Sequence, residues 1–255
     1  MLRDRCWSGL GAALCTWLLL LAGAAPASEI TFDDMDLSNG TIVNDQYEAE
    51  FGLTISAVNL AGGPDLAVLF DTSLRGTADP DLEYAKGGNL AFFNALIIQE
   101  NQEGCDDVSC DRPDDEGANP AGALIFAYQA SRPILDFGFD LLDIEEGEPE
   151  NFGSIVFCNG GAAQCDDGEQ GFVGRIEFGD FVRRDDAVFG DNTANRIAPI
   201  DLLTQFGIES ADTVVFEMAG SGAIDNISFA LVPEPATAAM LALGLAGLAW
   251  QGRRL

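Results

Sequence analysis

The sequence predicts an all-β protein built around an antiparallel β-sandwich of the jelly-roll type. Short apolar or alternating segments recur between residues 28 and 231, and glycines and other turn residues separate them. Helical periodicity is sparse, so the strands do not alternate with long helices as they would in a parallel α/β sheet. Many short strands joined by turns are typical of a sandwich.

Strands are expected where an apolar or alternating segment is bounded by turn residues. They are residues 29–33, 53–58, 66–70, 90–98, 123–128, 135–142, 154–158, 174–182, 213–218 and 223–230. The clearest alternation places Leu135, Phe137 and Phe139 on one face of a strand. Near Gly179 the alternation slips, which predicts a β-bulge. One short helix, ending at a glycine, is expected at residues 200–207.

The first 27 residues predict a secretory signal peptide rather than part of the fold. Arg3 and Arg5 give a positive start, and a short apolar core follows. Ala25-Pro26-Ala27 has the small residues that signal peptidase requires, so cleavage is expected before Ser28. The alternative is an uncleaved anchor, but the apolar segment falls short of the roughly 20 residues that span a bilayer.

The body, residues 28–231, is strongly acidic. The whole chain has 12 Lys+Arg, 42 Asp+Glu and a net charge of −30 at pH 7, and most of both charge types lie in the body. Such a surface repels phosphate backbones, which argues against nucleic acid as a partner, and it attracts divalent cations. Apolar and β-branched residues still run through the body, so it is expected to fold.

Four cysteines lie in the body as two close pairs in acidic, glycine-containing loops. They are Cys105, Cys110, Cys158 and Cys165. Four cysteines permit three pairings, and the short spacings favour Cys105–Cys110 and Cys158–Cys165 in an oxidising compartment. Zinc is the alternative, but the C-x4-C and C-x6-C spacings and the absence of histidine do not match the usual zinc sites.

Calcium is the cofactor that the acidic residues favour, because Ca2+ takes six to eight oxygen ligands. Two groups of ligands are expected near strand ends. The first group joins the first and last strands through Asp33, Asp34, Asp36, Asp225 and Asn226. The second group joins loops through Glu100, Asp114, Asp115, Asp143 and Glu145. The alternative is that these side chains are solvated surface charges or turn formers.

The absence of histidine removes most catalytic arrangements. No Ser-His-Asp or Cys-His set can exist, and no phosphate-binding GxxxxGK[ST] or GxGxxG motif occurs. The protein is therefore expected not to be an enzyme. The alternative is a polysaccharide-active enzyme that uses paired carboxylates, although a body this acidic brings some pair to a workable distance by number alone.

The aromatic residues divide into an expected core set and an expected surface set. The phenylalanines on alternating strands are expected in the core, and they include Phe92, Phe126, Phe137, Phe139, Phe178 and Phe216. Tyr47, Tyr84 and Tyr128 are the rings expected at the surface, where they would line a carbohydrate-binding groove.

The C-terminal segment has three parts in a fixed order. Val232-Pro233-Glu234-Pro235 stops the last strand, since proline cannot donate to a sheet ladder. Residues 236–250 predict an apolar helix that, at about 1.5 Å per residue, is shorter than a hydrocarbon core of roughly 30 Å. Arg253 and Arg254 would stay on the cytoplasmic side and leave the body outside. Taken alone, the segment could be a plain anchor or a buried helix.

These three parts in this order resemble the PEP-CTERM sorting signal, over residues 232–255. The sorting residues would be Val232, Pro233, Glu234, Pro235, Arg253 and Arg254. The resemblance implies that exosortase, a membrane-embedded transpeptidase-like enzyme, removes the short transmembrane helix. The protein would then reach the cell surface or extracellular matrix of a Gram-negative bacterium.

Segments of the body also resemble the ectodomains common among PEP-CTERM proteins. These segments are residues 30–33, 40–47, 51–54, 96–100, 139–145 and 223–229. The similarity implies a jelly-roll, lectin-like sandwich and assigns no catalytic residue.

We therefore expect three parts: a signal peptide at 1–27, an acidic ectodomain at 28–231 and a sorting tail at 232–255. The ectodomain is expected to be a structural or ligand-binding component, with Ca2+ as its cofactor and extracellular polysaccharide as its partner.

Overall fold

The computed structural model describes residues 27–35, 37–83, 93–143, 153–181, 190–232 and 244. The chain divides into two compact units, one formed by Ala27–Leu231 and the other by Met1–Pro26 with Val232–Leu255. The expected signal peptide, apart from Ala27, and the expected sorting helix, apart from Gly244, lie outside the described residues. In the described ranges, no helix is long and apolar enough to cross a membrane.

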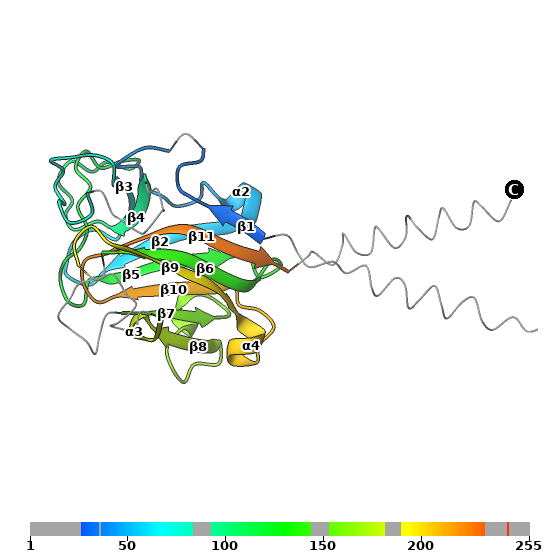
Figure 1. Cartoon of the computed structure of the whole chain (residues 1–255). Helices are drawn as coiled ribbons and strands as arrows, with labels where there is room; N and C mark the ends of the chain where they lie inside the picture. The colour runs from blue at the N-terminus through cyan, green and yellow to red at the C-terminus, as the bar shows by residue number, and fades with distance from the viewer. Residues whose placement is uncertain are drawn as a thin grey trace, which may run out of the picture. The chain divides into compact units, whose positions relative to one another are not determined.

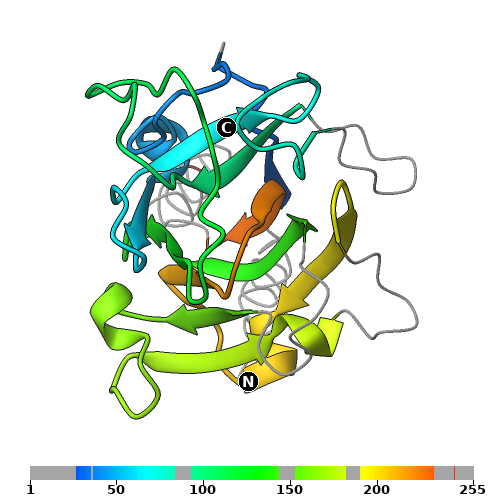
Figure 2. The same ribbon diagram turned by 90° about the vertical axis from the view of Figure 1, so that its left-hand side faces the viewer.

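The unit Ala27–Leu231 is a sandwich of two antiparallel sheets, as the sequence predicted. One sheet has six strands in the order β3-β4-β11-β6-β9, with β1 also pairing with β11, and the other has the order β2-β5-β10-β7-β8. In Figure 1 the two sheets overlap, and Figure 2 looks toward the ends of their strands. The bounds of the strands are β1 Ala27–Ile30, β2 Leu53–Asn59, β3 Ala67–Asp71, β4 Asn94–Ile98, β5 Gly122–Tyr128, β6 Ile134–Leu142, β7 Gly153–Cys158, β8 Phe172–Glu177, β9 Ala194–Asp201, β10 Thr213–Met218 and β11 Ala223–Leu231.

The main core fills the space between the sheets. Its centre is a cluster of rings: the Phe126 centroid lies 6.0 Å from that of Phe137 and 5.4 Å from that of Phe216. The expected core residues Phe126, Phe137, Phe139, Phe178 and Phe216 are all buried, whereas Phe92 lies outside the described residues. Burying each such ring contributes about 1.5–3 kcal/mol, so this ring cluster is a large part of what holds the sheets together.

The two outer faces of the sandwich differ. The outer face of the six-stranded sheet is covered by loops, which bury a second small core that includes Val68, Phe70, Leu82 and Ile97. The outer face of the five-stranded sheet carries a smaller apolar cluster around Val156 and the Cys158–Cys165 pair. That face is therefore the more open of the two.

The main error of the sequence prediction is strand β9, Ala194–Asp201, which was not expected. It contains Pro199, and a proline within an alternating segment argues against a strand. β9 is an edge strand, where a missing backbone donor is tolerated.

Other boundaries moved by a few residues. The strand expected at 174–182 ends at Glu177, and the expected bulge is instead the helical turn α3, Phe178–Phe181. The first strand ends at Ile30, because Phe32 takes a left-handed backbone conformation with φ of 57°. The expected helix at 200–207 is present as α4, Leu202–Phe206. Two further short helical turns, α2 Glu48–Phe51 and η1 Ala162–Gln164, were not expected.

The surface role expected for the tyrosines is wrong where the structure describes them. Tyr47 is 0% exposed and Tyr128 is 5% exposed, and both belong to the main core. Tyr128 packs edge-on against Phe229, while Tyr84 lies outside the described residues. These rings therefore do not form an exposed platform for sugars.

The cysteines pair locally as expected, Cys105 with Cys110 and Cys158 with Cys165. The first disulfide lies in the long loop between β4 and β5. The bridge Gln99↔Asp115 pairs two parts of this loop with each other, and the bridge Thr41↔Ser109 pairs the loop with the segment before β2. The second disulfide closes the loop that follows β7.

Candidate functional site

The open face of the five-stranded sheet presents side chains in two straight rows, because its strands pair in register. One row is Val58, Ala123, Glu217, Ser154 and Glu177, from β2, β5, β10, β7 and β8 respectively. The neighbouring row is Ser56, Ile125, Val215, Val156 and Arg175. The centre of the second row is aliphatic, whereas the first becomes polar at Glu217, Ser154 and Glu177.

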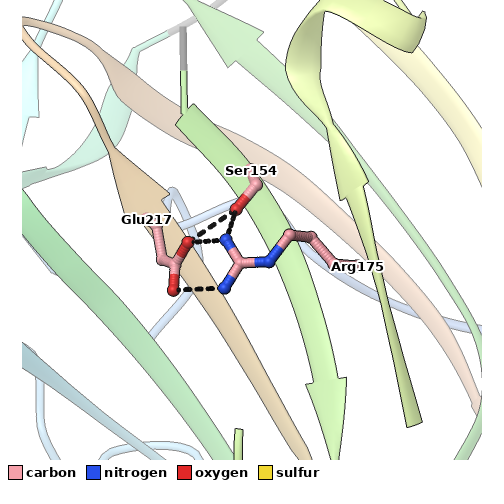
Figure 3. Close-up of polar contacts among 3 residues, drawn as sticks. All are labelled: Ser154, Arg175 and Glu217. Atoms are coloured by element: carbon pink, nitrogen blue, oxygen red, sulfur yellow. Dashed lines mark hydrogen bonds and ion pairs between the residues drawn. The ribbon is translucent and has the colours of Figure 1, made fainter. Parts of the chain in front are cut away.

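Arg175 reaches from the second row to the first and binds Glu217 across strand β7 (Figure 3). Its Nη2 donates to Glu217 Oε1 at 3.0 Å, and its Nη1 contacts Glu217 Oε2. Ser154 lies between them: its Oγ accepts from Arg175 Nη1 at 2.6 Å and donates to Glu217 Oε2 at 2.7 Å. A two-pronged guanidinium–carboxylate contact fixes orientation as well as charge, and the hydrogen bond to Glu217 raises the pKa of Arg175.

A groove of about 460 Å³ runs along this face, with Arg175, Ser154 and Glu217 among its lining residues. Its apolar lining includes Val58, Leu60, Ile125, Val215 and Met218, and the Cys165 side of the second disulfide loop forms part of its wall. A larger hollow of about 630 Å³ lies elsewhere and is lined by loop residues 61–64, 100–102 and 116. We regard the groove as the better candidate site, because regular strands position its side chains.

A second candidate is a buried acidic cluster at the end of the sandwich where β6 ends and β11 begins. We call it the Ser221 cluster: Asp79, Asp115, Asp143 and Ser221. The Ser221 Oγ lies 2.7 Å from both Asp115 Oδ2 and Asp143 Oδ2, and the Gly222 N–H donates to Asp115 Oδ2 at 2.6 Å. Asp79 Oδ1 accepts from the N–H groups of Asp81 and Leu82.

The carboxyl groups of the Ser221 cluster are shielded from water. Burial, together with the nearby charge and hydrogen bond of Asp79, raises the pKa of Asp115 well above its ordinary value. Burial is also the main cause that raises the pKa of Asp143 to about 7. In the described part of the chain, no group of three or more His, Cys, Asp or Glu side chains is arranged as it stands to hold a metal ion.

A third cluster of carboxylates lies a few residues away along the same two strands, and it contains a cation. We call it the Arg196 cluster: Asp33, Asp140, Asp225, Asn226 and Arg196. Asp225, Asp140 and Arg196 stand in register across β11, β6 and β9. Arg196 Nη2 donates to Asp140 Oδ2 at 3.0 Å, and Asn226 Nδ2 donates to Asp140 Oδ2 and Asp225 Oδ2. Burial is the main cause that raises the pKa of Asp225 to about 8.

The expected meeting of the first and last strands is confirmed, because β1 pairs with β11. Asp33 follows β1 and accepts from the Asn94 N–H at 2.9 Å, and its charge contributes to the raised pKa of Asp225. Asp34 instead accepts a hydrogen bond from the Tyr47 hydroxyl. Asp36 lies outside the described residues.

The second expected group is only partly brought together. Asp115 and Asp143 meet through Ser221, whereas Asp114 pairs with Glu100, and burial and that pairing raise the pKa of Asp114 to about 6. Glu145 lies outside the described residues.

Sequence reasoning missed Asp79, Ser221 and the whole arrangement of Arg175, Ser154 and Glu217. The alternation of β7 and β10 already places Ser154 and Glu217 on the outer face, so the exposure of these two side chains could have been predicted from the sequence. Which residue stands beside which across strands depends on pairing and register, and alternation does not give these.

The C-terminal residues 231–254 match the family model of the PEP-CTERM protein-sorting motif. The chain carries a PEP-CTERM sorting motif. The motif implies processing by an exosortase and an exported, surface-sorted protein. Of the expected sorting residues, only Val232 is described by the structure, and Pro233, Glu234, Pro235, Arg253 and Arg254 lie outside the described residues.

The comparisons over the rest of the chain are distant. No curated protein matches the chain. Among solved structures, it is similar to the K2 cleaved adhesin domain of Lys-gingipain, with 9% identity, a TM-score of 0.36, and coverage of 80% of this chain and 99% of that one. It is also similar to the enzymatically active domain of tailspike protein 4 of bacteriophage CBA120, with 14% identity and a TM-score of 0.29, over 77% of this chain and 21% of that one. At these TM-scores, neither likeness bears on function.

Proposed function

We propose that the ectodomain is a non-enzymatic binding component of the cell surface or extracellular matrix, and that its groove holds a neutral polysaccharide chain. The observation that carries the proposal is the fixed arrangement of Arg175, Glu217 and Ser154 in the middle of a largely aliphatic groove on the open face.

The groove matches the chemistry of a sugar chain, which has apolar C–H faces and hydroxyl groups on its edges. Val58 and Leu60, 37% and 62% exposed, offer aliphatic surface along the groove. Arg175 and Glu217 offer donors and acceptors whose positions are fixed before any ligand arrives, which lowers the entropy lost on binding. None of the lining residues that the structure describes is Phe, Tyr or Trp. Affinity would therefore come from many weak contacts along a chain rather than from ring stacking.

Charge narrows the class of polysaccharide. The chain has a net charge of −30, and the groove itself is lined by Asp166, Glu177 and Glu217 against the single Arg175. A surface with this described lining repels polyuronates and other anionic polymers. A neutral glycan is the class that the groove favours.

The alternative, a polysaccharide-active enzyme, would need a pair of working carboxylates. The groove offers Glu177 and Glu217, which flank Ser154 and stand two strand spacings apart, about 9–10 Å between backbones. Both oxygens of Glu217 are engaged by Arg175, so this carboxylate is poorly placed to deliver a proton. That engagement supports a binding role over hydrolysis.

Export and sorting complete the proposal. Signal peptidase would remove residues 1–27, and the tail would hold the protein in the inner membrane of a Gram-negative bacterium until an exosortase cleaves it. The acidic sandwich would then be displayed outside the cell, where polysaccharide is available as a partner.

A glycan array with the purified full chain tests the proposal, followed by titration of a neutral hexasaccharide and a uronate hexasaccharide. We expect binding of the neutral glycan and none of the uronate. Arg175→Met should weaken binding about tenfold, the effect of losing one hydrogen bond to a charged group. Ala123→Leu, which narrows the groove beside Glu217, should also weaken binding.

Glu209→Gln is the matched control, because Glu209 is exposed in the loop between α4 and β10. It should leave affinity unchanged. Absence of binding to every neutral glycan would refute the proposal, as would binding that neither groove variant changes. Release of reducing sugar from the bound glycan would replace the binding role with the enzymatic alternative.

A further inference from the structure

We propose that the Ser221 cluster is a calcium-binding site, with Asp79, Asp115 and Asp143 as carboxylate ligands and the Ser221 hydroxyl as a fourth. The site lies at the end of the sandwich that faces the viewer in Figure 2, where the chain turns from β10 into β11.

The first support is a pair of buried carboxylate oxygens that have no hydrogen-bond partner, Asp79 Oδ2 and Asp143 Oδ1. Asp79 is only 5% exposed and Asp143 only 2% exposed. An unpaired anionic oxygen away from water is costly. Buried carboxylates are paired in native proteins or coordinate a metal.

The second support is that Ser221 has one proton and two carboxyl neighbours, so the second contact needs either a proton on a carboxyl group or a cation. A serine hydroxyl has one proton to donate and two lone pairs that accept. The Ser221 Oγ is nevertheless 2.7 Å from one oxygen of Asp115 and from one oxygen of Asp143. Only one of these contacts can be a hydrogen bond from serine. A cation held by Asp115, Asp143 and Oγ would satisfy all three groups.

The third support is the charge around the cluster. The charged groups that act most strongly on Asp115 and Asp143 are Asp79, Asp81 and Asp191, and all three are acidic. A bound divalent ion would keep such like charges ionised together. In the Arg196 cluster, the guanidinium of Arg196 provides the positive charge that balances the carboxylates.

The donor set selects the ion. All the donors are oxygens, the chain has no histidine, and the four cysteines of the body are in disulfides. Oxygen-only sites suit Ca2+ and Mg2+, and an irregular set drawn from loops suits Ca2+, which accepts six to eight ligands in flexible geometry. Waters would complete the shell.

Binding would require the carboxylates to turn inward, since as they stand they do not surround one point. The four residues come from four segments: the loop after β3, the loop between β4 and β5, the end of β6 and the β10–β11 turn. An ion shared by these segments would tie three loops to the β10–β11 turn. Its main effect would therefore be on stability.

Thermal unfolding of the full chain tests the site in EDTA, in Ca2+ and in Mg2+, each ion at about 1 mM, the range of extracellular calcium modules. We expect Ca2+ to raise the melting temperature by about 3 °C or more over EDTA. Mg2+ should have a much smaller effect.

Asp79→Asn and Asp143→Asn separate a metal site from a structural role. Each variant removes an unpaired buried charge, so in EDTA it should be at least as stable as the wild type. Each should lose the response to Ca2+. The matched control is Asp225→Asn, in the Arg196 cluster, which should keep the response.

Three results would overturn the proposal. They are no difference between Ca2+ and EDTA for the wild type, an equal effect of Mg2+, and a Ca2+ response that survives in both Asp79→Asn and Asp143→Asn. A response lost only in Asp225→Asn would move the site to the Arg196 cluster.

Discussion

The Arg196 cluster and the Ser221 cluster bury carboxylates a few residues apart along the same two strands, but they balance the charge differently. Asp140 and Asp225 receive hydrogen bonds from Arg196 and Asn226. Asp115 and Asp143 share one serine hydroxyl, and Asp79 Oδ2 and Asp143 Oδ1 have no hydrogen-bond partner. Asp140 Oδ1 also has no hydrogen-bond partner, but it forms an ion pair with Arg196 Nε. The comparison teaches that buried acidic residues do not by themselves predict a metal site. A metal site is expected only where the protein does not supply enough hydrogen-bond donors or cationic side chains to the buried carboxylates.

The largest effect should come from pH, acting on the Arg196 cluster. The pKa of Asp225 is about 8 when folded and about 3.9 when unfolded. Between these values the folded protein binds a proton that the unfolded chain does not, so the stabilisation is complete below about pH 4 and is lost as pH rises toward 8. The loss should amount to a few kcal/mol. It can be measured by urea unfolding in EDTA across this range.

Asp225→Asn should reduce this pH dependence, because the amide does not titrate, whereas other carboxyl groups with a raised pKa, such as Asp143, still do. Asp45→Asn, at an exposed position, is the control and should leave the slope unchanged. If the dependence of unfolding free energy on pH were unchanged in Asp225→Asn, other buried acidic groups would account for it. The pKa of Asp225 would then not be raised as its burial in the Arg196 cluster indicates.

The next effect should come from removing the cation of the Arg196 cluster. Arg196→Met leaves Asp140, whose side chain is 0% exposed, without its charged partner. We expect a loss of about 2 kcal/mol in urea unfolding. This is below the roughly 3–5 kcal/mol typical of a fully buried pair, because the Arg196 side chain is 46% exposed.

The double variant Arg196→Met with Asp140→Asn should recover much of that loss, since it removes the unpaired charge together with the cation. A double variant no more stable than Arg196→Met would mean that the lost packing of the arginine, rather than its charge, set the cost. In that case the hydrogen bonds from Asn226, and not the charge of Arg196, would be what distinguishes the Arg196 cluster from the Ser221 cluster.

Effects of equal or smaller size should come from the neutral donors. Asn226→Gly removes two hydrogen bonds to carboxylates and keeps the left-handed backbone that Asn226 adopts, with φ of 48°. We expect it to cost about 2 kcal/mol in urea unfolding. Ser221→Ala should cost about 1 kcal/mol in EDTA, since one hydroxyl donates one bond. A larger cost for Ser221→Ala than for Asn226→Gly would contradict the view that the Ser221 cluster is poorly satisfied without a cation.

The parts of the molecule that the sequence predicted well are local. Alternation in residues 135–142 predicted a strand with Phe137 and Phe139 on its inward face, although Ile134 rather than Leu135 joins them in the core. Gly207 predicted the end of α4, where its φ is 73°. The cysteine pairs were predictable because their spacing left little room for other partners. The sorting motif is also local, since it is recognised as a continuous segment.

The candidate sites were predictable only in part. Asp115 and Asp143 were expected to meet, but their junction through Ser221 was not, and Asp79 was missed altogether. Arg175 and Glu217 are separated by 42 positions in the chain, and nothing in either strand indicates the other. The tyrosines were placed on the surface because an amphipathic ring suits either environment, and only the packing of the sheets decided for the interior.

The sequence by itself determined where this protein is sorted, that its body is a β-sandwich, and which face of most strands points inward. A period of two residues fixes the face of a strand, and a sorting motif acts as a linear segment. The tertiary structure decided which strands are neighbours and at what register. That choice placed Arg175 beside Glu217, gave Asp140 its arginine and brought Asp115 and Asp143 to Ser221, because pairing across sheets and loops brings together residues that are far apart in the chain.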